Sequence, residues 1–171
     1  MKADPMPEAE LLSAGWQQNR QQLEALFRDI PDDAMTRQAA GAINHPAWTL
    51  AHLIHYHPAI LSLLRGQPVS DPATARHTER YDAGSTPVDD PSQYPGRDAL
   101  LTAYRANHDE ARQLLETVST DTLSQPPGLP RWAEGFETTA RALVYLMHVH
   151  EALHIGQLMV WRRAMGWPPL E

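Results

Sequence analysis

Apolar residues recur at helical spacing in four stretches of the chain, and no stretch shows the alternation of a strand. The first stretch runs from about Pro5 to Asp29, with Asp4 as its expected N-cap. The second runs from about Pro46 to Arg65, the third from about 97 to 118, and the fourth from about 138 to 165. Prolines at the starts of the first two stretches, and glycines after the ends of the second and fourth, fit helix boundaries. The pattern therefore predicts an all-α protein with four long helices.

Two stretches lack a clear period. Gln67–Gly96 contains five prolines, and Ser119–Gly135 contains three more. A loop as long as the first is either functional or, in a four-helix protein, a crossover along a bundle. Pro58 lies inside the second helical pattern and is expected to kink or split it, although the apolar period continues beyond it.

Composition narrows the function classes. The chain has 171 residues, enough for one domain, and 42% of them are hydrophobic, enough for a core. The net charge is −7, and the largest basic cluster is Arg162–Arg163, which argues against a nucleic-acid partner. No leader-like start or apolar run of about 18 residues occurs, so we expect a cytoplasmic protein with no membrane partner.

The chain contains no cysteine. This excludes disulfides, zinc–thiolate sites and cysteine nucleophiles within it. A transition metal would have to be bound by histidines and carboxylates, a donor set that suits Zn, Ni, Mn or Fe.

The nine histidines are concentrated in the predicted helices, and one pair has a ligand-like spacing. His150 and His154 are four residues apart in the fourth helix, so both imidazoles lie on one face and can reach one ion. Leu143, Met147 and Leu158 share this face, which is therefore expected to point into the core. A buried neutral imidazole needs a partner for each nitrogen, and a metal ion on one of them would satisfy this need.

The pair also matches the His-Glu-x-x-His pattern of zinc proteases. That interpretation requires a third ligand, usually downstream, and Glu171 is the sole ligand-type residue after His154. A third ligand is thus expected upstream. His52 is a candidate, but considered alone it is explained more simply as a hydrogen-bonded core histidine.

Two motifs in combination resemble the DinB-like superfamily. They are Asn44-x-x-x-Trp48-x-x-x-His52 and His150-Glu-x-x-His154-x-Gly156-Gln157. The segments Tyr81–Pro87 and Arg162–Pro169 are also similar to those of its members. The resemblance implies that residues 1–171 form a single DinB-like domain, a four-helix bundle with a long crossover. It also implies one divalent metal ion, with Zn or Ni favoured over Mn or Fe, bound by His52, His150 and His154.

Other polar residues are candidates for the pocket or for the layer around the ligands. They are His45 at the start of the second helix, Trp48, His108 on the core face of the third helix, Glu151 and Gln157. His108 could be an acid or base, a distant fourth ligand or a core histidine. Glu151 is expected to support a ligand or join two helices, and Gln157 to hydrogen-bond a ligand imidazole or a metal-bound water. No catalytic residue is assigned.

The remaining residues of interest are expected to be structural. His148 should face away from His150, His55 should pack or lie at the surface, and His57 should be exposed. Gly156 should mark the close approach of another helix.

Three imidazoles leave a divalent ion with open coordination positions. The resemblance implies a metal-dependent thiol-S-transferase, or a related enzyme that joins a low-molecular-weight thiol to small electrophiles. Two alternatives stay open: a non-catalytic, metal-stabilised binding or sensing module, and a metal-hydroxide hydrolase. The expected partner is a small molecule, and the resemblance raises a homodimer as an alternative to a monomer.

Overall fold

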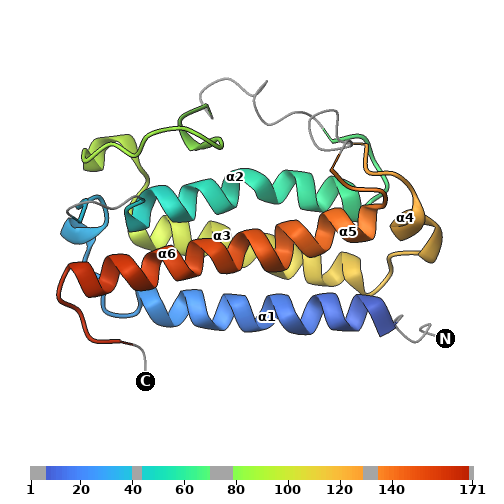
Figure 1. The fold of residues 1–171 in the computed structure, drawn as a ribbon, viewed down its shortest axis with the longest axis horizontal. Helices are drawn as coiled ribbons and strands as arrows, with labels where there is room; N and C mark the ends of the chain where they lie inside the picture. Colours follow the sequence, from blue (N-terminus) through green and yellow to red (C-terminus); the bar gives the residue numbers. More distant parts are fainter. Residues whose placement is uncertain (1–6, 40–43, 70–78, 129–134, 170–171) are drawn as a thin grey trace.

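The computed structural model describes residues 7–39, 44–69, 79–128 and 135–169 of the chain. Four long helical stretches lie side by side with nearly parallel axes (Figure 1). They are α1 (Pro7–Phe27), α2 (Pro46–Leu64), α3 (Arg97–Leu115) and a composite of α5 (Thr139–Leu143), the π-helical segment η5 (Val144–His150) and α6 (Glu151–Ala164). No strand occurs within the described ranges, which confirms the all-α prediction for them.

Among the described residues, four short helices lie outside the long ones. One follows α1 directly, and the others lie in segments where the sequence shows no helical period. The four are η1 (Asp32–Ala34), η3 (Glu79–Tyr81), η4 (Pro91–Gln93) and α4 (Thr120–Ser124). Each is five residues or shorter, which is too short to show a helical period in the sequence.

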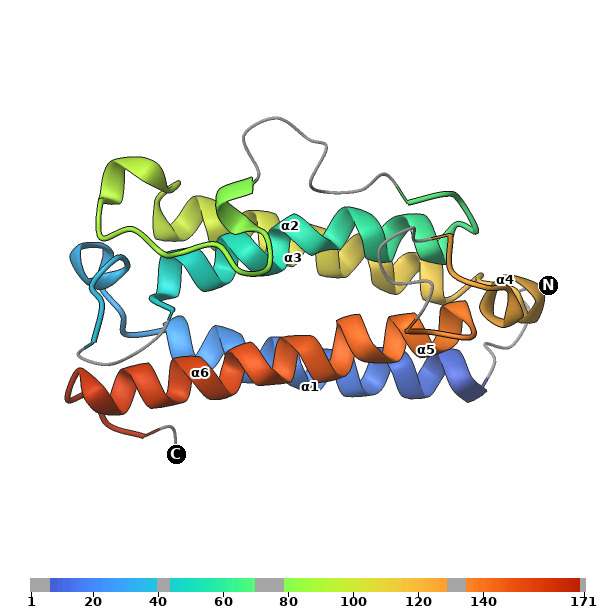
Figure 2. The ribbon, with the colours of Figure 1, turned by 45° about the horizontal axis from the view of Figure 1, so that its top comes forward.

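The helices form two layers. Figure 2 shows α2 beside α3, and α1 beside α6. Both α2 and α3 start at the end of the molecule where α1 finishes (Figure 1). The end of α2 and the start of α3 therefore lie at opposite ends of the molecule.

The boundaries of α2 follow from its sequence. His45 is the N-cap, Pro46 fills the first turn, and Gly66 adopts a left-handed φ of 63° just after the last turn. Pro58 lies within α2 without ending it and is exposed, so its ring points away from the core. Asp4 and Pro5, expected at the start of the first helix, lie outside the described residues.

The apolar core consists of two clusters, one toward each end of the molecule. One includes Trp16, Leu63 and Leu143, and the other includes Phe27 and Leu158. Between them, each long helix contributes polar side chains rather than apolar ones. This middle band contains His52, His150 and His154.

None of the described helices combines the length and the apolar character needed to cross a bilayer.

Candidate metal centre

Three histidine side chains converge in the middle band. His52 comes from α2, His150 from the end of η5 and His154 from the first turn of α6. The Nε2 atom of His150 lies 3.0 Å from Nε2 of His52 and 3.2 Å from Nε2 of His154. Imidazole nitrogens bound to one tetrahedral Zn²⁺ at about 2.0–2.1 Å would lie about 3.3 Å apart. The three atoms are therefore spaced to bind one ion.

The second nitrogen of two of these rings is held by a hydrogen-bond acceptor. Nδ1 of His52 donates to the carbonyl of Tyr81 over 2.6 Å, and Nδ1 of His154 donates to Oε1 of Gln157 over 3.0 Å. The same Gln157 oxygen accepts from the Asn44 amide at 2.9 Å, which fixes the orientation of the glutamine. Because the proton is on Nδ1, the lone pair of Nε2 points at the centre.

The pKa values of the three histidines also favour the neutral imidazole form, which can bind a metal ion. Burial and the neighbouring imidazoles lower the pKa of His52 and of His150 to about 3, and burial lowers the pKa of His154. All three rings are therefore neutral at pH 7, the form that binds metal. His52 is 3% exposed and His154 7%, whereas His150 is partly exposed, so the group reaches the surface on the His150 side.

Two aromatic residues pack around His52. The Trp48 ring stacks on the imidazole with 4.5 Å between centroids, and the Tyr56 ring meets it edge-on at 4.9 Å. The Tyr56 hydroxyl donates to Asp82 over 2.6 Å, and the Trp48 indole donates to the carbonyl of Arg80. Tyr56 was missing from the sequence prediction, although its four-residue spacing from His52 places both on one helix face.

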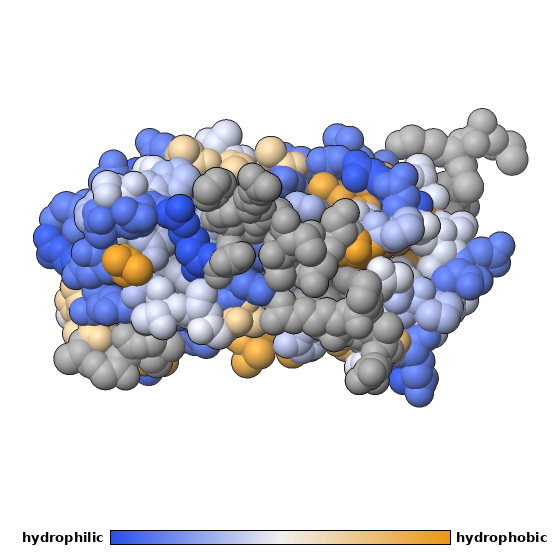
Figure 3. Space-filling view, turned by 90° about the horizontal axis from the view of Figure 1, so that it is seen from above, coloured by the Kyte–Doolittle hydropathy of each residue, from blue (hydrophilic) through white to orange (hydrophobic). Residues whose placement is uncertain are grey.

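No carboxylate and no fourth histidine of the described residues belongs to this group. An ion bound here would keep coordination positions for an external ligand. Val149 and Leu153 directly precede His150 and His154 and are exposed, Leu153 by 57%. Hydrophobic side chains also gather at the lower edge of Figure 3, the side on which α6 lies. The surface near the group is thus partly apolar.

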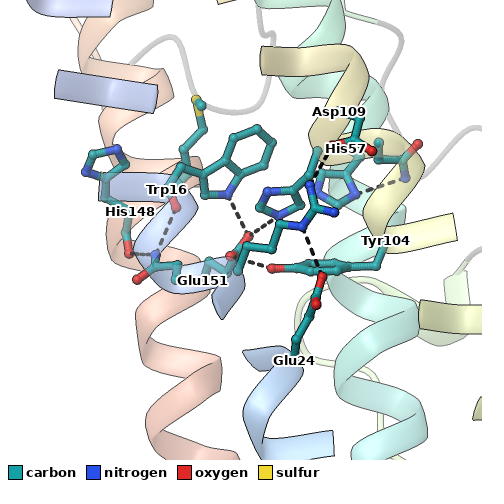
Figure 4. Close-up of polar contacts among 12 residues, drawn as sticks. Trp16, Glu24, His57, Tyr104, Asp109, His148 and Glu151 are labelled. Carbon is teal, nitrogen blue, oxygen red and sulfur yellow. Dashed lines mark hydrogen bonds and ion pairs between the residues drawn. The ribbon is translucent and has the colours of Figure 1, made fainter. Parts of the chain in front are cut away.

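Glu151 and His108 belong to a separate buried network. The Glu151 carboxyl accepts from Trp16 Nε1 and from the Tyr104 hydroxyl, both at 2.7 Å, and lies 3.3 Å from Nε2 of His108 (Figure 4). Trp16 stacks on His108 with 3.7 Å between centroids. Burial raises the pKa of Glu151 to about 8 and lowers that of His108 to about 3, so the pair is neutral at pH 7. Glu151 thus joins α6 to α1 and α3, and His108 lies outside the three-histidine group.

His57 corrects one expectation, since it is buried rather than exposed. Neighbouring residues of an α-helix point about 100° apart. Pro58 is exposed, and the ring of His57, one residue earlier, therefore faces α3. There Nδ1 lies 2.9 Å from the side-chain amide of Asn107.

The face of the last helix is a second correction. His150 was expected on the core-facing stripe, but the most buried position of that turn belongs to Glu151, which is 2% exposed. The π-helical turn of η5 takes more residues than an α-helical turn, so the stripe moves on by one residue. His150 consequently lies on the flank that faces α2.

The predicted close approach at Gly156 is wrong. Gly156 is exposed, and a Cβ atom there would meet nothing within 4 Å. The tight contact is at Gly15 of α1, where a Cβ would lie 2.6 Å from the ring of His148. His148 in turn donates from Nε2 to the carbonyl of Leu12 at 2.8 Å, on the side of the helix away from the three-histidine group.

His45 has both ring nitrogens engaged by the backbone. Nδ1 accepts from the N–H of Trp48, and Nε2 donates to the carbonyl of Val88, each over 3.1 Å. It therefore caps α2 and links this helix to the segment around Val88, and it is not part of the three-histidine group. His55 is buried and packs edge-on against Tyr56.

Comparison with known proteins identifies the fold and the family of the chain. A solved structure of a Streptococcus pneumoniae protein is similar to this chain, with a TM-score of 0.67 and 11% sequence identity over 96% of this chain and 93% of that one. At that identity the likeness shows the fold. No curated protein matches the sequence. A family profile described as the DinB superfamily matches residues 16–158, so this chain belongs to the DinB superfamily.

Proposed function

We propose that this protein is a metal-dependent enzyme that joins a low-molecular-weight thiol to a small electrophile. His52, His150 and His154 would bind one divalent ion, Zn or Ni in first place. The observation that carries the proposal is the convergence of three neutral imidazoles, with Nε2 atoms 3.0 and 3.2 Å apart and no fourth ligand from the described residues. The helix arrangement supports the four-helix bundle with a long crossover that the family resemblance implies.

The donor set favours this chemistry. When bound, the ion would act as a Lewis acid that keeps a thiol deprotonated at neutral pH. The chain has no cysteine of its own, so the sulfur would come from a second molecule. That molecule would approach the ion from the partly exposed side of His150, where Val149 and Leu153 form an apolar surface.

The residues around the ligands have supporting roles. Tyr81 and Gln157 hold the proton of His52 and of His154 on Nδ1, and the Trp48 ring covers one face of His52 and shields it from water. In the reaction the sulfur would form a bond to an electrophilic carbon, the leaving group would depart with its electron pair, and the thiol proton would pass to solvent.

The test is a conjugation assay. The purified protein, loaded with Zn²⁺ or Ni²⁺, is mixed with a set of common low-molecular-weight thiols and an activated aryl halide. We expect conjugation above the uncatalysed rate, lost on chelation and restored by the metal, and absent in His150→Ala. A rate equal to background for every thiol contradicts the transferase proposal. Consumption of the halide without thiol would instead favour the hydrolase.

A further inference from the structure

The π-helical segment η5 determines where His150 points. Leu143 and Met147 are fully buried, and the next inward position is Glu151. These positions are four residues apart, a spacing that an α-helix of 3.6 residues per turn does not keep on one face. A return to α-helical geometry would turn every later residue by about 100° relative to α5. His150 would then leave the flank that faces His52.

Helix α1 contacts this segment through its polar side chains. The Asn19 amide donates its two hydrogens to two successive carbonyls of η5, Met147 at 3.1 Å and His148 at 3.2 Å. A π turn displaces carbonyls from their usual α-helical donors, and such groups need partners when they are buried. Asn19 adds donors to these carbonyls from outside the helix, and at the His148 carbonyl it acts beside the N–H of Glu151.

Two further contacts from the same face of α1 hold the neighbouring residues. Gly15 leaves room for the His148 ring, which donates to the carbonyl of Leu12. Trp16 donates to Glu151, the first residue after η5. Leu12, Gly15, Trp16 and Asn19 follow the i, i+3, i+4, i+7 spacing of one helix face.

We infer that Asn19 is a positioning residue, which holds the π turn of η5 open from α1 and thereby aims His150 at His52. The inference rests on the proposed metal site, and it adds that a side chain contacting no ligand imidazole sets the site's geometry. His150 lies between the held residues His148 and Glu151, so its direction follows from theirs.

The test compares Asn19→Asp with Gln18→Glu. Aspartate has the shape of asparagine but no hydrogens to donate, whereas Gln18 is the exposed neighbour and its substitution makes the same change of charge. Metal affinity is measured by competition with a chelating indicator, at a temperature where circular dichroism shows each variant folded. We expect Asn19→Asp to bind metal about 10-fold more weakly or worse, the size of loss seen when groups that orient metal ligands are removed. Gln18→Glu should stay within about twofold of wild type, since it changes no group that orients a ligand.

A second readout needs no metal. In the metal-free protein, amide hydrogen exchange over residues 144–154 should be faster in Asn19→Asp than in Gln18→Glu. If the wild type binds no metal, the proposed function fails, and the exchange comparison alone decides the role of Asn19. Equal exchange rates, or wild-type affinity in folded Asn19→Asp, would overturn the inference.

A second variant serves if Asn19→Asp does not fold. In Gly15→Ala the new methyl group would push the His148 ring off the Leu12 carbonyl. We expect a severalfold loss of metal affinity, relieved when His148→Ala is added to the same chain. Wild-type affinity in Gly15→Ala contradicts the positioning role of α1.

Discussion

At the scale of single residues, the histidines are distinguished by the groups that their ring nitrogens contact. His52 and His154 donate from Nδ1 to oxygen acceptors and present Nε2 to the centre. His45 uses both nitrogens on backbone groups and is a cap. His108 lies against a buried carboxyl and an indole ring. The histidines thus lie in different surroundings, which their hydrogen-bond partners distinguish.

Glu151 gives a prediction about pH. Its pKa is about 8 in the folded protein and near 4.5 when unfolded, so between these values the folded state holds a proton that the unfolded state has lost. Stability from this group therefore falls as pH rises through that window. Glu151→Gln cannot titrate, and the other groups cancel in the comparison. In metal-free protein the stability of wild type relative to Glu151→Gln should fall by up to about 1.4 kcal/mol per pH unit from pH 5 to 7.5. Urea denaturation at each pH measures this, and parallel curves would contradict the raised pKa.

Sequence reasoning reached some of these residues and missed others. The four-residue spacing identified His150 and His154 as a pair, and the family resemblance supplied His52. Tyr81 acts through its backbone carbonyl, for which residue type carries no signal. Asn19 lies more than a hundred residues from the helix it contacts, and only the packing of α1 on η5 brings them together.

At the scale of elements, the long helices followed from apolar period, capping residues and terminal glycines. The π segment did not, because a template with 3.6 residues per turn assigns Val144–His150 to an ordinary helix. The sequence alone does not reveal it, because the contacts of Asn19 with the Met147 and His148 carbonyls arise only when α1 packs against η5. This one element explains why Glu151 rather than His150 occupies the core-facing position.

His45 caps the N-terminus of α2, the helix that contains His52, and this cap is predicted to stabilise the fold. Removing the His45 ring in His45→Ala takes away the acceptor for the Trp48 N–H, whereas asparagine in His45→Asn can replace it. Both changes remove the bond to Val88, so their difference isolates the cap. We expect His45→Ala to be less stable than His45→Asn by about 1 kcal/mol in chemical denaturation. Equal stability of the two would show that the cap contributes nothing.

At the scale of the whole molecule, the two apolar clusters leave a polar band between them, and all four long helices contribute to it. The band contains two groups with separate roles. The neutral network of Glu151 joins α1, α3 and α6 in the interior, while the three-histidine group lies between α2 and α6 and reaches the surface. Apolar period alone could not show which helices adjoin, so the separation of these groups emerged from the fold.

The most direct test of the three-histidine centre is elemental analysis of the purified protein after metal loading and gel filtration. We predict one divalent ion per chain in the wild type and in His55→Ala, which removes a buried imidazole of the same helix outside the group. The combined variant His52→Ala, His150→Ala, His154→Ala should retain none. A wild type without stoichiometric metal, or a combined variant that keeps the wild-type amount, would contradict the assignment of these three histidines as the ligands.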